Sequence, residues 1–231
     1  MIDFSRFEVF SFDCYGTLID WESGILAALR PILGTRGIAV TDEQILELYG
    51  ELESEIESAG YQPYRAILRQ VVDRMGKRLD FAPTDAERNC LVDSLGRWPA
   101  FGDTVEALRA LKAKYRLAII SNVDDDLFAL TNKTLQVDFD YVITAAQAGA
   151  YKPSEQVFHY ALKKIGVDKE RILHVAQSLF HDHTPAQRLG FTTVWIDRRR
   201  GKAGGGATPP SAVRPDAEFP DLKSLVSAMG L

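Results

Sequence analysis

Five polar side chains, spread over four short segments, could act together on a small anionic molecule. They are two carboxylates, an ammonium group, a small hydroxyl and the amide next to it: Asp13, Asp182, Lys152, Ser121 and Asn122. A carboxylate becomes an effective nucleophile when an oriented cation holds it and bulk water is kept away. Its attack forms an ester or an acyl phosphate. The residue types therefore suit nucleophilic catalysis through a covalent aspartyl intermediate.

We expect Asp13 to be the nucleophile and Lys152 to be its charge partner. The ammonium group would keep the carboxylate ionised and stabilise charge that develops in the transition state. The hydroxyls of Ser121 and Thr17, with the amide of Asn122, would hold the anionic group of the substrate. Each feature alone has an ordinary alternative, since an aspartate often bonds its own turn and a Ser-Asn pair often caps a helix. Their order along the chain favours the functional interpretation.

These segments lie at, or just beyond, the ends of predicted strands. Apolar runs and alternating patterns predict strands at 6–12, 116–121, 139–143, 171–176, 192–196 and 217–219. Helices are predicted at 154–165, at 183–189 and from Asp221 onward. Alternating strands and helices indicate an α/β fold with a parallel sheet, in a Rossmann-like three-layer core. Because ligands of such sheets bind at the carboxyl ends of the strands, we expect the segments to meet in one crevice.

An all-helical block separates the first strand from the others. Capping-box patterns begin predicted helices at Thr41 and at Thr84, and the second of these helices should end near Gly96. The simplest arrangement inserts residues 20–98 as a helical cap domain. Residues 1–19 and 99–231 then form the core domain, with chain crossings near Asp20-Trp21 and Trp98-Pro99. Such a cap could exclude bulk water from the crevice.

Composition excludes several other classes of protein. The chain has 231 residues, 46% of them hydrophobic, and a formal net charge of −5. This charge argues against nucleic acid or a membrane surface as a partner, and no apolar run is long enough to span a membrane. The two cysteines, Cys14 and Cys90, and the absence of a recognisable secretory signal predict a reduced, cytoplasmic protein. Cys14 is expected to be buried and inert rather than nucleophilic.

The chain resembles the haloacid dehalogenase superfamily over almost its whole length. The matching features are the signature at 13–17, Ser121-Asn122, Lys152-Pro153, the terminal Asp182 and the inserted helical cap. The resemblance implies a Rossmann-like core with Asp13 as nucleophile, Lys152 as its charge partner and Ser121 as an anion-binding hydroxyl.

Tyr15 narrows the resemblance to one branch. Phosphatases of the superfamily generally carry a second aspartate two residues after the nucleophile, where it protonates the leaving alkoxide. Tyr15 occupies that place, which resembles the 2-haloacid dehalogenase branch. A halide needs no proton when it leaves, and an aromatic wall suits a large, weakly hydrated anion.

We predict neither a metal nor another cofactor. In metal-dependent members of the superfamily an acidic residue occurs where this chain has Gln177, and the loss of that anionic oxygen disfavours Mg²⁺. Asp13, the Tyr15 carbonyl and Asp182 could still bind the ion weakly. The run 181–183, His-Asp-His, could suggest a metal site, but adjacent residues rarely point at one ion. A role in shaping the pocket, or capping of the following helix by Asp182, is the favoured interpretation. His159 and His174 are assigned to surfaces and given no function.

One feature of the dehalogenase branch is missing. Its members use an arginine of the first cap helix, just after an aromatic residue, to hold the departing halide. Gly50 follows Tyr49 at this place. Arg65 or Arg69 on the next predicted helix could substitute, and the aromatic rings of Trp21, Tyr49 and Tyr61 could line the cleft.

Two basic or glycine-rich stretches follow the fifth predicted strand. Residues 198–200 are three consecutive arginines, which could grip an anion but are interpreted as a solvated charge run. Residues 201–207 are rich in glycine and are predicted to form a flexible loop.

The sequence thus predicts a metal-independent 2-haloacid dehalogenase. Asp13 would attack C2 of a short 2-haloalkanoic acid, and water activated near Asp182 or Lys152 would hydrolyse the resulting ester. The alternatives are a Mg²⁺-dependent phosphatase acting on a small phosphorylated metabolite and a non-catalytic binding or regulatory protein. The expected partner is a small anionic molecule, and apolar outer faces of the cap helices would allow a homodimer.

Overall fold

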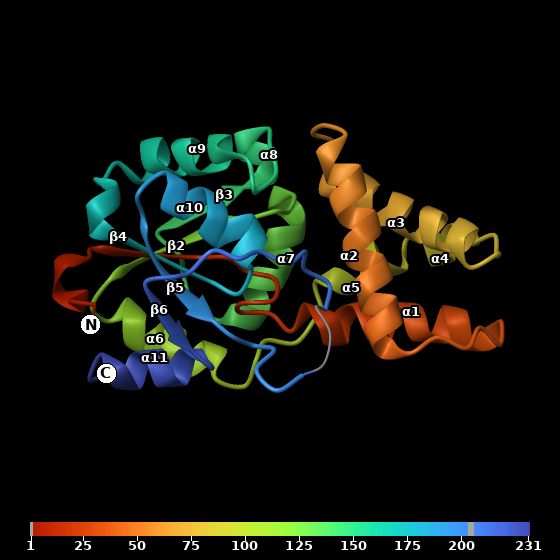
Figure 1. Cartoon of the computed structure of the whole chain (residues 1–231), viewed down its shortest axis with the longest axis horizontal. Helices are drawn as coiled ribbons and strands as arrows, with labels where there is room; N and C mark the ends of the chain where they lie inside the picture. The colour runs from red at the N-terminus through yellow and green to blue at the C-terminus, as the bar shows by residue number, and fades with distance from the viewer. Residues whose placement is uncertain (1, 203–205) are drawn as a thin grey trace.

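Six parallel strands form one sheet through the middle of the core (Figure 1). The computed structural model describes residues 2–202 and 206–231, so part of the predicted loop at 201–207 lies outside the described residues. The strand order is β3-β2-β1-β4-β5-β6. The strands are β1 (Val9–Phe12), β2 (Arg116–Ser121), β3 (Tyr141–Thr144), β4 (Ile172–Ala176), β5 (Thr192–Ile196) and β6 (Ala217–Phe219).

β1 lies in the middle of the sheet between β2 and β4. Phe12, its last residue, pairs with Ile119 of β2 and with Val175 of β4. All four residues of β1 are buried, as expected for a strand covered on both faces. The strand is shorter than the predicted 6–12, because Phe4–Arg6 forms a 3₁₀ turn capped by Asp3. Asp13 therefore follows directly from a fully buried central strand.

Helices cover both faces of this sheet. α6 (Thr104–Lys112) and α11 (Leu222–Ala228) pack together on one face. α8 (Ala145–Ala148), α9 (Glu155–Ile165) and α10 (Thr184–Arg188) cover the other face (Figure 1). α7 (Asp125–Leu135) follows β2 at the cap side and contacts the cap. The predicted three-layer α/β core is confirmed.

Five helices between β1 and α6 lie together at one side of the core (Figure 1). They are α1 (Trp21–Thr35), α2 (Asp42–Ser58), α3 (Tyr64–Arg78), α4 (Asp85–Arg88) and α5 (Cys90–Leu95). The capping boxes at Thr41 and Thr84 both form. The predicted helix after Thr84 is broken, because the backbone turns at Asn89, whose side chain donates to the Asp85 carbonyl.

Both chain crossings between core and cap lie side by side. The Asp20 amide donates to the Pro99 carbonyl at 2.8 Å, and the Phe101 amide donates to Leu18 at 3.1 Å. Ile19 and Ala100 form an antiparallel bridge at the same place. The two connections therefore support each other where the cap begins and ends.

One predicted helix has different bounds in the structure. The segment predicted as a helix at 183–189 begins with a single π-helical turn, η3 (Leu179–His183), followed by the short α10. The wider turn lets Asp182 and His183 both be buried next to the sheet.

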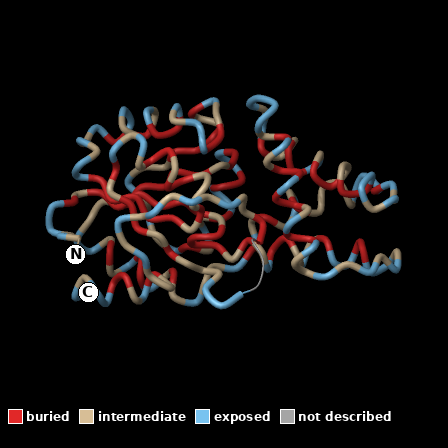
Figure 2. The backbone as a smooth tube through the Cα atoms, in the orientation of Figure 1, coloured by how far each residue is buried: buried red, intermediate tan, exposed pale blue. Residues whose placement is uncertain are grey.

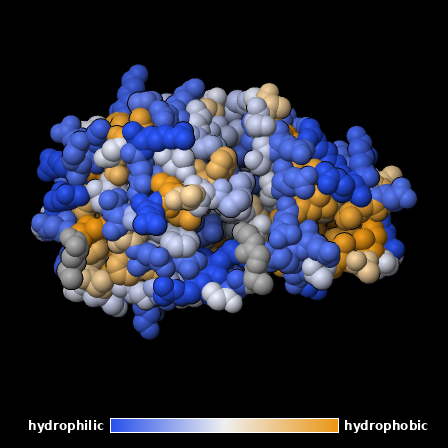
Figure 3. Space-filling model, viewed as in Figure 1, coloured by the Kyte–Doolittle hydropathy of each residue, from blue (hydrophilic) through white to orange (hydrophobic). Residues whose placement is uncertain are grey.

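The interior and the surface differ as expected for a globular chain. Buried residues run through the sheet and along the inner sides of the helices (Figure 2). On the face drawn in Figure 3, hydrophilic side chains cover most of the core, whereas apolar side chains gather among the cap helices. In the described part of the chain, no helix combines the length and apolar character needed to cross a membrane.

A tight contact joins α1 to the end of the cap. A Cβ added at Gly24 would lie 2.3 Å from Cγ of the Trp98 indole. We therefore predict that Gly24→Ala lowers the free energy of unfolding by about 1–3 kcal/mol through overpacking. A Cβ added at Gly34 of the same helix would meet no atom within 4 Å. Gly34→Ala should therefore raise the free energy of unfolding by about 0.5–1 kcal/mol. Urea unfolding measures both, and equal effects of the two substitutions would contradict this packing.

Candidate active site

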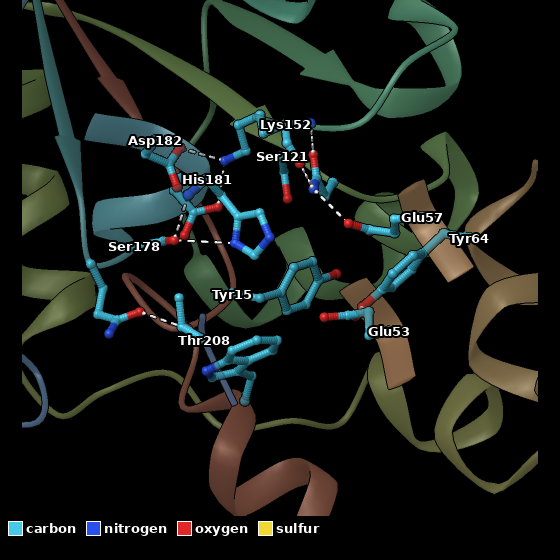
Figure 4. Close-up of a pocket in the computed structure, with 14 residues that line it drawn as sticks. Tyr15, Glu53, Glu57, Tyr64, Ser121, Lys152, Ser178, His181, Asp182 and Thr208 are labelled. Atoms are coloured by element: carbon cyan, nitrogen blue, oxygen red, sulfur yellow. Dashed lines mark hydrogen bonds and ion pairs between the residues drawn. The ribbon is translucent and has the colours of Figure 1, made fainter. Parts of the chain in front are cut away.

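The carboxyl ends of β1, β2 and β4 meet the cap at a small cavity (Figure 4). Its volume is about 40 Å³. Residues of the core and the cap both line it: Asp13, Tyr15, Trp21, Glu53, Glu57, Tyr64, Ser121, Asn122, Lys152, Gln177, Ser178, His181, Asp182 and Thr208. The four segments singled out in the sequence thus converge, and six of the seven predicted site residues line the cavity.

Lys152 joins the two carboxylates. Its Nζ lies 2.9 Å from Asp13 Oδ1 and 2.6 Å from Asp182 Oδ1, and it also donates to the Ile120 carbonyl at 2.8 Å. The Lys152 side chain is only 2% exposed. All three N–H groups of the ammonium therefore have acceptors, which fixes the position of the charge.

Burial and neighbouring charges shift the titration of these three groups. Burial raises the pKa of Asp13, the charge of Asp182 raises it further, and Lys152 and Thr17 oppose the rise without cancelling it. Burial acts in the same direction on Asp182, but Lys152 and His174 outweigh it and lower its pKa. Burial lowers the pKa of Lys152, whereas the two carboxylates raise it by more. Lys152 and Asp182 therefore remain ionised, and Asp13 takes up a proton more readily than a free aspartate.

The predicted role of Thr17 needs correction. Its hydroxyl donates to Asp13 Oδ2 at 2.8 Å and accepts the Gln177 amide at 2.9 Å. Thr17 is fully buried and does not line the cavity. The residue following the tight turn at Gly16 therefore orients the Asp13 carboxylate instead of holding the substrate.

Ser121 and Asn122 differ in whether their polar side-chain atoms already have hydrogen-bond partners. The Ser121 hydroxyl is buried, lines the cavity and has no hydrogen-bond partner within the described residues. Asn122 instead exchanges two hydrogen bonds with the backbone of Lys152, at 2.8 and 3.0 Å. Ser121 thus offers a donor to a bound molecule, whereas Asn122 also fixes the loop that carries the ammonium group.

Asp182 has a partner that the sequence did not indicate. His174, assigned to a strand surface from the sequence, is fully buried. Its Nε2 lies 3.1 Å from Asp182 Oδ1, and its Nδ1 lies 3.0 Å from the Ser11 hydroxyl. The two ring nitrogens of His174 thus connect Asp182 to Ser11. Asp182 Oδ2 is buried without a partner in the described part of the chain, so it can accept from a molecule in the cavity.

His181 lines the cavity, as the pocket-shaping role predicted for the run 181–183 suggests. The Ser178 hydroxyl accepts the His181 amide at 2.9 Å and lies 3.1 Å from its Nδ1. Burial lowers the pKa of His181 to about 4, so its ring is neutral near pH 7. The His181 ring is directed into the cavity (Figure 4).

Tyr15 forms part of the cavity wall, as its position in the sequence suggested. Its hydroxyl is 2.8 Å from Thr131 Oγ1, and its ring meets the Trp98 indole edge-on at 5.9 Å. Burial raises the pKa of Tyr15 well above its usual value. The neighbouring Cys14 is fully buried as predicted, and burial likewise raises the pKa of its thiol. Neither group is set up to exchange protons with a substrate.

The cap contributes acidic groups to the cavity. Glu53 Oε1 accepts hydrogen bonds from Tyr49 at 2.7 Å and from Tyr64 at 2.6 Å. Glu57, one turn later on α2, reaches Asn122 Nδ2 with its Oε2 at 3.5 Å. The sequence held a signal for this pair, since two glutamates four residues apart share the apolar face of an amphipathic helix.

The cap arginine of the dehalogenase branch has no counterpart at the cavity. A Cβ at Gly50 would lie 2.4 Å from the Ala207 carbonyl oxygen, so backbone of the core fills this place. Arg65 pairs with Asp124, and Arg69 donates to Asn89 at 2.7 Å. Neither arginine lines the cavity, so the expectation that one of them substitutes is wrong.

Of the three aromatic residues that were predicted to line the cleft, only one lines the cavity. Trp21 lines the cavity, whereas Tyr49 is buried behind Glu53. Tyr61 is 43% exposed and lines a separate surface pocket.

The arginine run at 198–200 is not simply solvated. Arg198 donates to the Thr17 carbonyl at 3.0 and 3.1 Å and pairs with Asp103. Arg199 pairs with Glu22 of α1 and Glu43 of α2. The two side chains are 7% and 12% exposed, and only Arg200 is largely exposed. The run therefore supports the nucleophile loop and ties the cap to the core.

A second connection holds α3 of the cap. Asp124 follows β2, and its carboxylate accepts the Tyr64 amide at 2.8 Å and the Arg65 amide at 3.1 Å. These are the first free amides of α3, where a negative charge is favoured. The cap is thus fixed over the cavity from two sides.

The donor set does not fit a divalent cation. The two carboxylates that could ligate Mg²⁺ already share the Lys152 ammonium group, and Gln177 supplies no negative charge. Within the described residues, no three acidic, histidine or cysteine side chains are grouped as metal ligands. The positive charge between Asp13 and Asp182 comes from the chain itself.

Comparison with known proteins gives a consistent result. A family model described as haloacid dehalogenase-like hydrolase matches residues 7–182. The (S)-2-haloacid dehalogenase of Pseudomonas sp. strain YL is 30% identical, over 94% of this chain and 91% of that protein. The (S)-2-haloacid dehalogenase of Pseudomonas putida is 29% identical, over 82% of this chain and 84% of that protein.

A solved structure shares the fold. The L-2-haloacid dehalogenase from Xanthobacter autotrophicus, with chloropropionic acid covalently bound, superposes with a TM-score of 0.81. It is 21% identical, and the alignment covers 97% of this chain and 98% of that chain.

Without the Lys152 ammonium group, the repulsion between the Asp13 and Asp182 carboxylates is no longer compensated. We predict that Lys152→Met lowers the free energy of unfolding by about 3–5 kcal/mol near pH 7. Without Lys152 the folded-state pKa values of Asp13 and Asp182 rise, so the loss should shrink as the pH falls and both groups take up protons. Urea unfolding at a series of pH values from 7 downward measures the loss of stability. Lys163→Met, at an exposed position on α9, is the control. A loss independent of pH would contradict the assignment.

Proposed function

The chain belongs to the haloacid dehalogenase-like hydrolase family, and from this premise we propose that it is a hydrolase that removes halide from short 2-haloalkanoic acids. The observation that carries the proposal is the set of contacts made by the Asp13 carboxylate. It faces the cavity with Lys152 on one oxygen and Thr17 on the other, and no acidic residue follows two positions later. The names of the two Pseudomonas relatives support the same reaction.

The first step is a displacement at carbon. An Asp13 carboxylate oxygen attacks C2 of the substrate, a C–O bond forms, and the C–halogen bond breaks with its electron pair leaving on the halide. The fixed positions of Lys152 and Thr17 hold the nucleophile in one orientation, which lowers the entropic cost of the attack. The free Ser121 hydroxyl can donate to the substrate carboxylate.

The second step is hydrolysis of the aspartyl ester. Water attacks the carbonyl carbon of Asp13 and the acyl C–O bond breaks. One proton of the water goes to the departing oxygen, which gives the 2-hydroxy acid, and the other is released as the Asp13 carboxylate returns. Because each Asp13 oxygen already has a donor, the carbonyl oxygen is polarised whichever oxygen formed the ester. Asp182 Oδ2 is the buried, unpartnered acceptor that can orient the attacking water.

The leaving group distinguishes this reaction from phosphate ester hydrolysis. An alkoxide needs a proton as it departs, whereas a halide does not. Tyr15 occupies the position at which a general acid would be needed, and its hydroxyl makes a hydrogen bond with Thr131. The small cavity also favours substrates with few atoms.

Asp13→Asn should abolish turnover. We predict that halide release from 2-chloropropionate falls by at least about a thousandfold, because the neutral amide cannot act as the nucleophile. Asp138→Asn, at an exposed position after α7, should retain the activity of the unmodified protein. Halide release should be the same with and without a chelator.

Two results would contradict the proposal. One is the absence of halide release from every short 2-haloacid tested. The other is phosphate release from phosphorylated metabolites that requires Mg²⁺, which would favour the phosphatase alternative.

A further inference from the structure

The cavity has an unusual balance of charge for a site that accepts an anion. Four carboxyl groups line it, two from the core and two from the cap: Asp13, Asp182, Glu53 and Glu57. Among the described lining residues, Lys152 is the one lysine or arginine. Its three N–H groups are already committed to Asp13, Asp182 and the Ile120 carbonyl. An ionised cap would therefore repel the carboxylate of a 2-haloacid.

Glu57 is the cap carboxyl that contacts the core machinery. Its Oε2 accepts Asn122 Nδ2 at 3.5 Å, next to Ser121 and to the loop that carries Lys152. Its Oε1 makes no hydrogen bond to any described residue, although the side chain lines the cavity. A protonated carboxyl suits these surroundings, because one oxygen accepts from Asn122 and the other donates into the cavity.

The groups around Glu57 favour its neutral form. Glu53 lies one helical turn earlier on α2 and is 5% exposed. Tyr64 of α3 and Tyr151 before α9 are buried phenols, and they supply no positive charge. Burial raises the pKa of Glu57 well above its usual value, Glu53 raises it further, and Lys152 only partly opposes the rise.

We propose that Glu57 enters the reaction as a neutral carboxylic acid and that its O–H is the hydrogen bond donor that the cap offers to the anionic substrate. This inference rests on the proposed function, since it takes the substrate to be a carboxylate. Glu57 also couples substrate binding to pH, because loss of the proton turns a donor into a second repelling charge.

Binding of propionate tests the proposal without turnover. Propionate has the carboxylate of the substrate but no halogen, and isothermal titration calorimetry measures its affinity between about pH 6 and pH 9. For the unmodified protein we expect the affinity to fall about tenfold per pH unit above the pKa of Glu57, since one proton must be retained for binding. Glu57→Gln, which is neutral throughout, should keep an affinity that varies less than threefold over the same range.

Controls separate this effect from other titrations. Glu55→Gln removes an exposed acid of the same helix, and its pH profile should match that of the unmodified protein. His181 is already neutral in this range and does not contribute to the pH dependence. A pH dependence unchanged in Glu57→Gln would overturn the proposal, and so would an affinity of the unmodified protein that does not vary with pH.

Failure of this inference can be told apart from failure of the proposed function. Halide release from 2-chloropropionate reports on the reaction, and propionate binding reports on the cap carboxyl. Halide release with a pH-independent affinity would overturn only the role of Glu57. Glu57-dependent propionate binding without halide release from any 2-haloacid would support the anion site and overturn the dehalogenase reaction.

Discussion

The whole site depends on one buried ammonium group placed between two carboxylates. Removing two like charges from water into the same few ångströms is costly unless a cation and further hydrogen bonds compensate them. Lys152 provides that compensation, and its bond to the Ile120 carbonyl ties the charge to the end of β2. The strand order explains why this is possible, because β1 lies between β2 and β4 and brings Asp13 to the point where the other segments end.

The cap completes the site by enclosing it. Asp124 binds the first amides of α3, and Arg199 pairs with acids of α1 and α2, so the cap is attached to the core at both sides of the cavity. The backbone at Ala207 packs directly on Gly50 and leaves no space for a side chain there. An arginine like the one that the resemblance implies for this position therefore has no room in this structure.

The sequence predicted those parts of the structure that local patterns determine. Strand bounds at 116–121, 192–196 and 217–219 were confirmed, and the capping boxes at Thr41 and Thr84 were correct, because hydrophobic period and capping act over a few residues. The partners of His174 and the position of the Thr17 hydroxyl depend on contacts between distant segments, which no local pattern encodes. The same holds for Arg199, whose charge is neutralised by helices more than a hundred residues away in the sequence.

The central claim is that Asp13 forms a covalent ester, and isotope labelling tests it most directly. In a single turnover with enzyme in excess and water enriched in oxygen-18, the hydroxy acid should receive an unlabelled oxygen from Asp13. Hydrolysis of the ester should then leave the heavy isotope in the Asp13 carboxylate, where mass spectrometry of the peptide detects it. Label found in the product of the first turnover, with Asp13 unlabelled, would show direct attack by water and contradict the account.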